Sequence, residues 1–162
     1  MNHLLASLLV FSLPWAAAAD SARPLVNDKK APENRQDLLA IQAALTSTLA
    51  QARAATVCID LGQNSGSGVL VSADGLILTA AHVTSGVNQD LTVVLEDGRK
   101  FKGVSLGLVA DCDAAMIRIT DKSEFPFIEI DRKDSTRLGD WVFALGHSGG
   151  FDKERGSVVR LG

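Results

Sequence analysis

The chain has 162 residues and a formal net charge of −3, because 19 Asp and Glu outnumber 16 Lys and Arg. This length is enough for one ordinary domain. The mild acidity argues against nucleic acid as a partner, since nucleic-acid-binding proteins normally present a basic face. The two cysteines, Cys58 and Cys112, are too few for a disulfide scaffold. They could form one bridge or remain two buried thiols, and the sequence leaves both possibilities open.

Residues 1–19 are predicted to be a secretory signal peptide. Residues 4–13 are an apolar run, which is too short to span a bilayer. Small residues ending at Ala19 then supply a cleavage site, so Asp20 is the expected first residue of a periplasmic or secreted protein. A short N-terminal anchor is the alternative. No other stretch is long and apolar enough to cross a membrane.

A helix is predicted over residues 34–55, after a polar and flexible lead-in at residues 20–33. Apolar residues recur there at helical spacing: Leu38, Ile41, Leu45, Leu49 and Ala52. The expected role of this helix is to cover one open end of a barrel.

Residues 56–130 are predicted to form a first β-barrel. Short β-like runs alternate with turn residues there, and the expected strands lie at 56–61, 68–72, 76–79, 91–96, 99–109 and 114–120. Glycine-containing turns at 73–75 and 97–98 are typical of hairpins. Closely spaced short strands favour a closed antiparallel barrel, since closure removes exposed edges.

Residues 131–162 are predicted to be a connector followed by the start of an incomplete second β-barrel. Two further strands are expected, at 140–146 and 157–161. Two strands without partners cannot bury both of their faces. We therefore expect the chain to stop inside a second domain.

His82 and Asp113 are the candidate catalytic residues. His82 follows an apolar strand and two small residues, which would aim its imidazole out of the barrel, and a neutral imidazole can exchange protons at physiological pH. Asp113 opens another apolar strand, where a carboxylate is costly unless it is hydrogen-bonded. The His82 ring would satisfy it. Asp111 is the competing carboxylate, and an ordinary loop histidine or aspartate is the alternative for each.

Five blocks of the chain, in this order, resemble the trypsin-like serine endopeptidases, most closely the bacterial HtrA-like branch. The blocks are GSGVLV at 66–71, ADGLILTAAHV at 73–83, EDGR at 96–99, DAAMIRI at 113–119 and LGDWVFALG at 138–146. The resemblance implies an all-β fold: a trypsin-like six-stranded antiparallel β-barrel with an N-terminal helix and the first strands of a second barrel. It also implies that His82 and Asp113 match the catalytic His and Asp, that polypeptides are the substrates, and that no cofactor is needed.

The family nucleophile lies in a Gly-Asn/Asp-Ser-Gly-Gly-Pro segment of the second barrel, together with the oxyanion-hole amides. Residues 1–162 contain no such segment. Ser148, within 146–150, imitates it, but Phe151 replaces the proline and the segment follows the 138–146 block, where the family has a turn. The same residues fit the nucleophile elbow of α/β-hydrolases, yet the helix and later His that this fold requires are missing. We therefore expect Ser148 not to be the nucleophile.

The combined interpretation is an exported serine endopeptidase present as an N-terminal portion that lacks its nucleophile. The alternative is a non-catalytic, truncated or degenerate protease-like module that at most binds peptides. No metal site is expected, because His82 and His147 are far apart and show no paired spacing.

Overall fold

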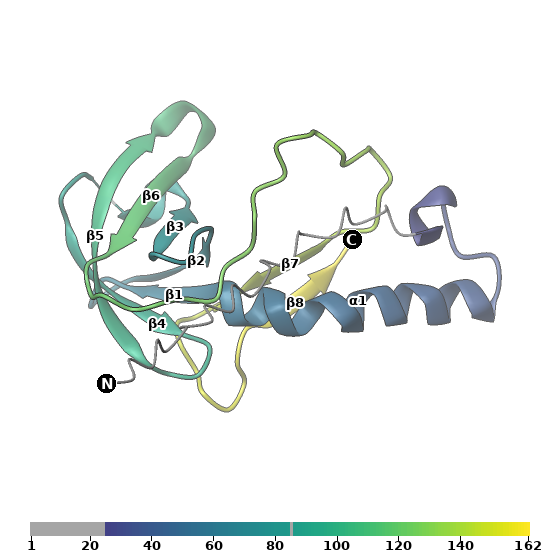
Figure 1. Ribbon diagram of the computed structural model, residues 1–162, viewed down its shortest axis with the longest axis horizontal. Coiled ribbons are helices and arrows are strands. Elements are labelled where there is room, and N and C mark those ends of the chain that lie inside the picture. Colours follow the sequence, from purple (N-terminus) through teal and green to yellow (C-terminus); the bar gives the residue numbers. More distant parts are fainter. Residues whose placement is uncertain (1–24, 85) are drawn as a thin grey trace, which may run out of the picture.

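The computed structural model describes residues 25–84 and 86–162. It contains a barrel, a long helix that projects from it, and a small second sheet (Figure 1). The elements are η1 (Leu25–Asp28), α1 (Arg35–Ala55), β1 (Thr56–Asp60), β2 (Ser65–Leu70), β3 (Leu76–Thr79), α2 (Ala81–Thr84), β4 (Asp90–Leu95), β5 (Lys100–Val109), η2 (Ala110–Cys112), β6 (Ala114–Ile119), β7 (Phe143–Gly146) and β8 (Val158–Leu161). The predicted signal peptide, residues 1–19, lies outside the described residues.

The six strands β1 to β6 form a closed antiparallel barrel in the order β1-β2-β3-β6-β5-β4, with β4 paired back to β1. Each neighbouring pair is antiparallel. The predicted fold class, an all-β barrel with an N-terminal helix and the first strands of a second sheet, is confirmed.

The barrel interior is filled by alternate side chains of its strands. The most deeply buried are branched aliphatic residues: Val57, Ile59, Leu70, Ile77, Val93, Leu95 and Ile117. Each such side chain contributes about 1.5–3 kcal/mol when fully buried. Glycine makes room for them on β2, since a Cβ on Gly68 would lie 2.6 Å from Ile77 Cγ2. The glycine-rich entry to β2 is therefore required by packing.

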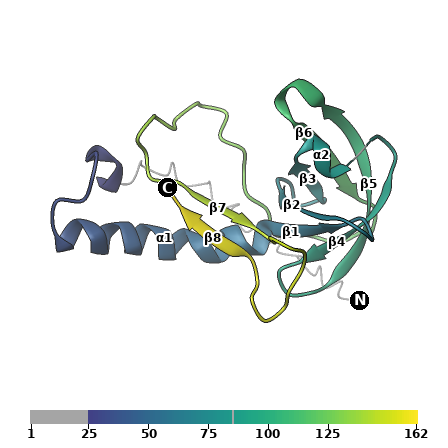
Figure 2. The same ribbon diagram turned by 180° about the vertical axis from the view of Figure 1, so that it is seen from behind.

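Helix α1 does not cover an open end of the barrel, so that prediction was wrong. The helix continues directly into β1 and projects away from the barrel (Figures 1 and 2). Only Ile41, Ala52 and Ala55 are buried along it, and Leu38 is 55% exposed. No residue separates α1 from β1, so the chain has no loop in which to turn the helix back over the barrel.

The junction of α1 and β1 is held by hydrogen bonds at Thr56. Its backbone N–H donates to the carbonyls of Ala52 and Arg53, and its Oγ1 donates to Ala52 O at 2.8 Å. At the other end, Asn34 caps the helix by accepting from the Asp37 amide at 3.0 Å.

Strands β7 and β8 form a two-stranded antiparallel sheet, with Phe143 paired to Leu161 and Gly146 to Val158. Strand β7 begins at Phe143 rather than at the predicted residue 140. It contacts β1 and β2 of the barrel. Both strands are at most half-buried, as expected for a sheet with so few strands.

The two cysteines are free, which rules out the disulfide that the sequence left open. Cys58 is buried in the middle of β1, between β2 and β4, whereas Cys112 is exposed in the turn between β5 and β6. Burial, together with the Asp60 carboxylate, raises the pKa of the Cys58 thiol. The expectation of two buried thiols holds only for Cys58.

Candidate active site

His82 is held at the barrel surface by the short helix α2, which follows β3 almost directly. Ala81 and Thr84 are buried, and the Thr84 hydroxyl donates to Ala81 O at 3.2 Å. Val83 packs so closely on β2 that a Cβ on Gly66 would lie 2.5 Å from Val83 Cγ1. These contacts fix the backbone while the His82 side chain remains 73% exposed.

Asp113 is placed by the turn between β5 and β6. It follows η2 and adopts the left-handed conformation, with φ 51° and ψ 43°, which aspartate tolerates better than most residues. Its carbonyl accepts from the Ala81 amide at 3.1 Å, so the two loops are joined through their backbones as well. A β-bulge between Ser105 and Gly107 lies just upstream of this turn.

The Asp113 carboxylate binds His82 at two points. Oδ2 lies 2.7 Å from the imidazole Nδ1, and Oδ1 accepts from the His82 backbone N–H at 3.0 Å. The donation from this amide and from the ring holds the pKa of Asp113 below its usual range. An ionised carboxylate accepts hydrogen bonds, so Nδ1 carries the proton and Nε2 is the free base of the ring.

The two alternative candidates, Asp111 and Ser148, take no part in the contact between Asp113 and His82. Asp111 lies in η2, and within the described ranges it makes no hydrogen bond to His82. Ser148 lies in the turn after β7, where its carbonyl accepts from Arg155 Nη2 at 2.7 Å. Across residues 25–84 and 86–162, no serine hydroxyl is hydrogen-bonded to the His82 ring.

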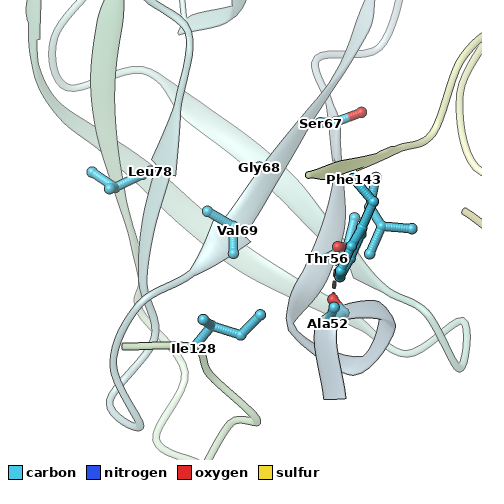
Figure 3. Close-up of a pocket in the computed structure, with 9 residues that line it drawn as sticks. Ala52, Thr56, Ser67, Gly68, Val69, Leu78, Ile128 and Phe143 are labelled. Carbon is cyan, nitrogen blue, oxygen red and sulfur yellow. Dashed lines mark hydrogen bonds between the residues drawn. The ribbon is translucent and has the colours of Figure 1, made fainter. Parts of the chain in front are cut away.

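A largely apolar groove of about 430 Å³ lies between the barrel and β7, separate from His82 and Asp113 (Figure 3). Val69 and Leu78 project from the outer face of neighbouring strands, with Phe143 opposite them. The complete lining is Ala52, Thr56, Ser67, Gly68, Val69, Leu78, Ile128, Phe143 and Leu145. The groove thus marks the face of the barrel against which the second sheet packs.

Sequence reasoning found the two side chains but missed how they are supported. It did not anticipate the bond from the His82 amide to Asp113, nor the role of Gly66 beneath Val83. The alternation of Gly66 and Gly68 along one strand was the available signal, because glycine in a strand often marks close approach of another chain segment.

A comparison with known protein families matches a part of the chain that contains both His82 and Asp113. Residues 66–161 match the family model described as the trypsin-like peptidase domain. This chain belongs to the trypsin-like peptidase family. The matched range includes His82, Asp113, most of the barrel and both strands of the second sheet.

The trypsin-like chain also has curated relatives of the HtrA type. It is 36% identical over 95 residues to Putative protease Do-like 14 of Arabidopsis thaliana, covering 54% of this chain and 22% of the relative. It is 40% identical over 82 residues to Serine protease HTRA4 of Homo sapiens, covering 51% and 17%. It is 36% identical over 87 residues to Probable periplasmic serine endoprotease DegP-like of Halomonas elongata, covering 54% and 18%.

These alignments confirm the resemblance to trypsin-like, HtrA-type proteases. They also show that the chain spans only about a fifth of the length of the relatives that it matches.

Proposed function

We propose that this chain carries the His–Asp half of the active site of an exported serine endopeptidase. The observation that supports this most strongly is the two-point contact of Asp113 with His82, at 2.7 Å and 3.0 Å. It leaves His82 Nε2 as an exposed base with a fixed ring orientation. Family membership makes polypeptides the proposed substrates.

In the proposed reaction, His82 Nε2 accepts the proton of a serine hydroxyl while the serine oxygen bonds to the peptide carbonyl carbon. The carbonyl electron pair moves to its oxygen, and its return expels the amine, which takes the proton from His82. Water then attacks the acyl-enzyme by the same route and regenerates the serine. Asp113 remains ionised throughout and stabilises the imidazolium form of His82.

The serine and the oxyanion-hole amides are proposed to come from a Gly-Asn/Asp-Ser-Gly-Gly-Pro segment of a second barrel, outside residues 1–162. This part of the proposal rests on the family resemblance. The start of a second sheet at β7 and β8 supports it. No cofactor takes part in the proposed reaction.

A non-catalytic, peptide-binding role is the second candidate. One observation favours it: in the part of the chain that the structure describes, His82 has no serine partner. The coding sequence after Gly162 separates the two candidates. A Gly-Asn/Asp-Ser-Gly-Gly segment there supports the enzyme, and an immediate stop codon supports the binding role.

The proposed location is the periplasm or the cell exterior. Residues 1–19 supply the predicted export signal, and several relatives are named as periplasmic endoproteases. Within the ranges that the structure describes, none of the helices could span a membrane.

A fluorophosphonate probe, which labels activated serines, tests the proposed reaction on the product of the complete open reading frame. We expect labelling of that product, loss of labelling in His82→Ala, and no change in the matched control Ser148→Ala. The 162-residue chain alone should remain unlabelled, because loss of the nucleophile from such a set lowers kcat by roughly 10⁶-fold.

Two outcomes would contradict the proposal. A complete product that is neither labelled nor able to digest casein would favour the non-catalytic role. Labelling of Ser148 in the 162-residue chain, abolished by His82→Ala, would make the turn at 146–150 a working nucleophile loop.

A further inference from the structure

The loop that joins β7 to β8, residues 147–157, folds back onto the first barrel (Figure 2). We call it the clasp loop. At its start the His147 amide donates to Ser67 Oγ on β2 at 2.8 Å. At its end the Ser157 amide and hydroxyl donate to Glu96 Oε1 at 3.1 and 3.2 Å. These bonds attach both ends of the loop to the barrel.

His147 is the most deeply buried ionisable side chain of this contact. Its ring is fully buried and lies beside Phe151, with 5.7 Å between the ring centroids. Neither Nδ1 nor Nε2 has a hydrogen-bond partner in the described residues, although Nε2 lies 3.5 Å from Glu96 Oε2. A buried imidazole without hydrogen bonds is tolerable when neutral and costly when charged.

The ionisable groups around His147 come from the end of β4, from α1, from β1 and from the clasp loop itself, while β2 contributes only the Ser67 hydroxyl. Glu96, directly after β4, lies 3.5 Å from His147 Nε2 through Oε2, and its Oε1 lies 3.7 Å from Arg53 Nη1 of α1. Arg155 approaches from the clasp loop itself, and the Cys58 thiol of β1 lies against the Phe151 backbone. Glu96 thus faces Arg53 and His147.

The balance of these groups disfavours protonation of His147 in the docked loop. Burial lowers the pKa of His147 most strongly and Arg155 lowers it further, while Glu96 opposes them. The resulting pKa is below the ordinary value. Glu96 already accepts from Ser157 and faces Arg53, so its charge is shared.

We propose that docking of the clasp loop is controlled by pH. The loop holds the second sheet on the first barrel while His147 is neutral, and it undocks from the barrel when His147 is protonated. The geometry supplies a buried base, a docked segment with both ends tied to the barrel, and no buried partner that fully satisfies the protonated ring.

The sign of the pH dependence follows from proton binding. The docked loop binds fewer protons than the free loop, because the pKa of His147 is lower when it is docked. Docking is therefore at full strength above the ordinary histidine pKa of about 6.5. It weakens as the pH falls from there towards the lowered value, by at most about tenfold per pH unit for one proton.

Amide hydrogen exchange on the 162-residue chain tests this directly. We expect the protection factors of the His147 and Ser157 amides to fall several-fold between about pH 7.5 and about pH 5. The core amides of Ile77 and Ile117 serve as the internal reference and should keep their protection. A parallel loss at the reference amides would mean global acid unfolding and would overturn the proposal.

Two variants identify the group that titrates. His147→Gln replaces the ring with a neutral amide and should abolish the pH dependence at Ser157. The matched control His82→Gln removes the exposed histidine of the described residues and should leave the pH dependence intact. A pH dependence that survives in His147→Gln, or disappears in His82→Gln, would contradict the proposal.

An NMR titration of the His147 ring in the unmodified chain keeps the proposal testable if His147→Gln does not fold. We expect this ring to titrate below the ordinary histidine value. Glu96→Gln should extend the loss of docking to lower pH, because it removes the carboxylate that lies 3.5 Å from Nε2 and raises the pKa of His147. Protection that instead rises on acidification would show that Glu96 captures the charged ring and tightens the clasp loop.

Discussion

At the scale of single residues, Asp113 fixes the orientation of His82. Its two oxygens are used differently, one to hold the ring and one to hold the backbone of the same residue. The pKa of Asp113 is lowered by these donors, so the carboxylate is ionised at neutral pH. The pKa of Asp113 is lower in the folded protein than its ordinary value of 3.8. The stability that this contact contributes is therefore lost only as the pH falls from about 3.8 through the lowered pKa of Asp113.

Asp113→Asn should lower the proposed peptidase activity of the complete open-reading-frame product by about 10⁴-fold while the fold is retained. The amide oxygen of Asn can still accept from the His82 backbone, but its NH₂ group facing Nδ1 forces the ring into the tautomer with the proton on Nε2. Casein digestion measures the loss. The matched control Asp111→Asn should keep full activity, and an equal loss in that control would mean that the wrong carboxylate has been assigned.

At the scale of elements, the strands could be predicted because each one carries its own signal. Residues 76–79 were predicted to be a strand with the bounds that β3 has, since an apolar run between turn residues needs no tertiary information. The bounds of α1 were also close. Its position was not predictable, because periodicity reports only that one helix face is apolar and not what covers that face.

The site was predictable to a similar extent. His82 and Asp113 could be selected because each adjoins an apolar strand. Their second hydrogen bond depends on the left-handed backbone of Asp113, which the sequence does not reveal. The set of His147, Glu96 and Arg53 was not predicted, since its members are distant in the sequence. The first barrel and α1 bring Arg53 to Glu96, and the return of β7 and β8 adds the buried His147.

Gly75→Ala should destabilise the barrel by about 2–4 kcal/mol. Gly75 has φ 86°, and an added Cβ would lie 2.9 Å from Ile119 Cβ and 3.1 Å from the Phe125 ring. Urea unfolding measures the loss. Gly107→Ala is the matched control, because a Cβ there meets nothing within 4 Å and the φ is not positive. Equal free energies of unfolding for the two variants would contradict the close packing of Gly75 against Ile119 and Phe125.

At the scale of the whole molecule, the described chain divides into a closed barrel and a two-stranded sheet. The first barrel is closed, with every strand paired on both sides. The second sheet has two strands and relies on the clasp loop and the apolar groove for its attachment. We therefore expect the barrel to contribute most of the free energy of unfolding.

Export of the whole protein should remove residues 1–19 and leave Asp20 as the first residue. The apolar run at 4–13, followed by small residues, is the pattern that signal peptidases cleave. N-terminal sequencing of periplasmic or secreted material checks this. A retained Met1 on exported protein would instead support a short N-terminal anchor.

Hydrogen bonds at the junction of α1 and β1 attach the helix directly to the first strand of the barrel. A helix of 21 residues is about 30 Å long, and the bonds of Thr56 resist bending where it joins the barrel. Strand β1 pairs with β2, and Gly66 of β2 lies against Val83 beside His82. A single strand pair thus separates the base of the helix from the segment that carries the imidazole.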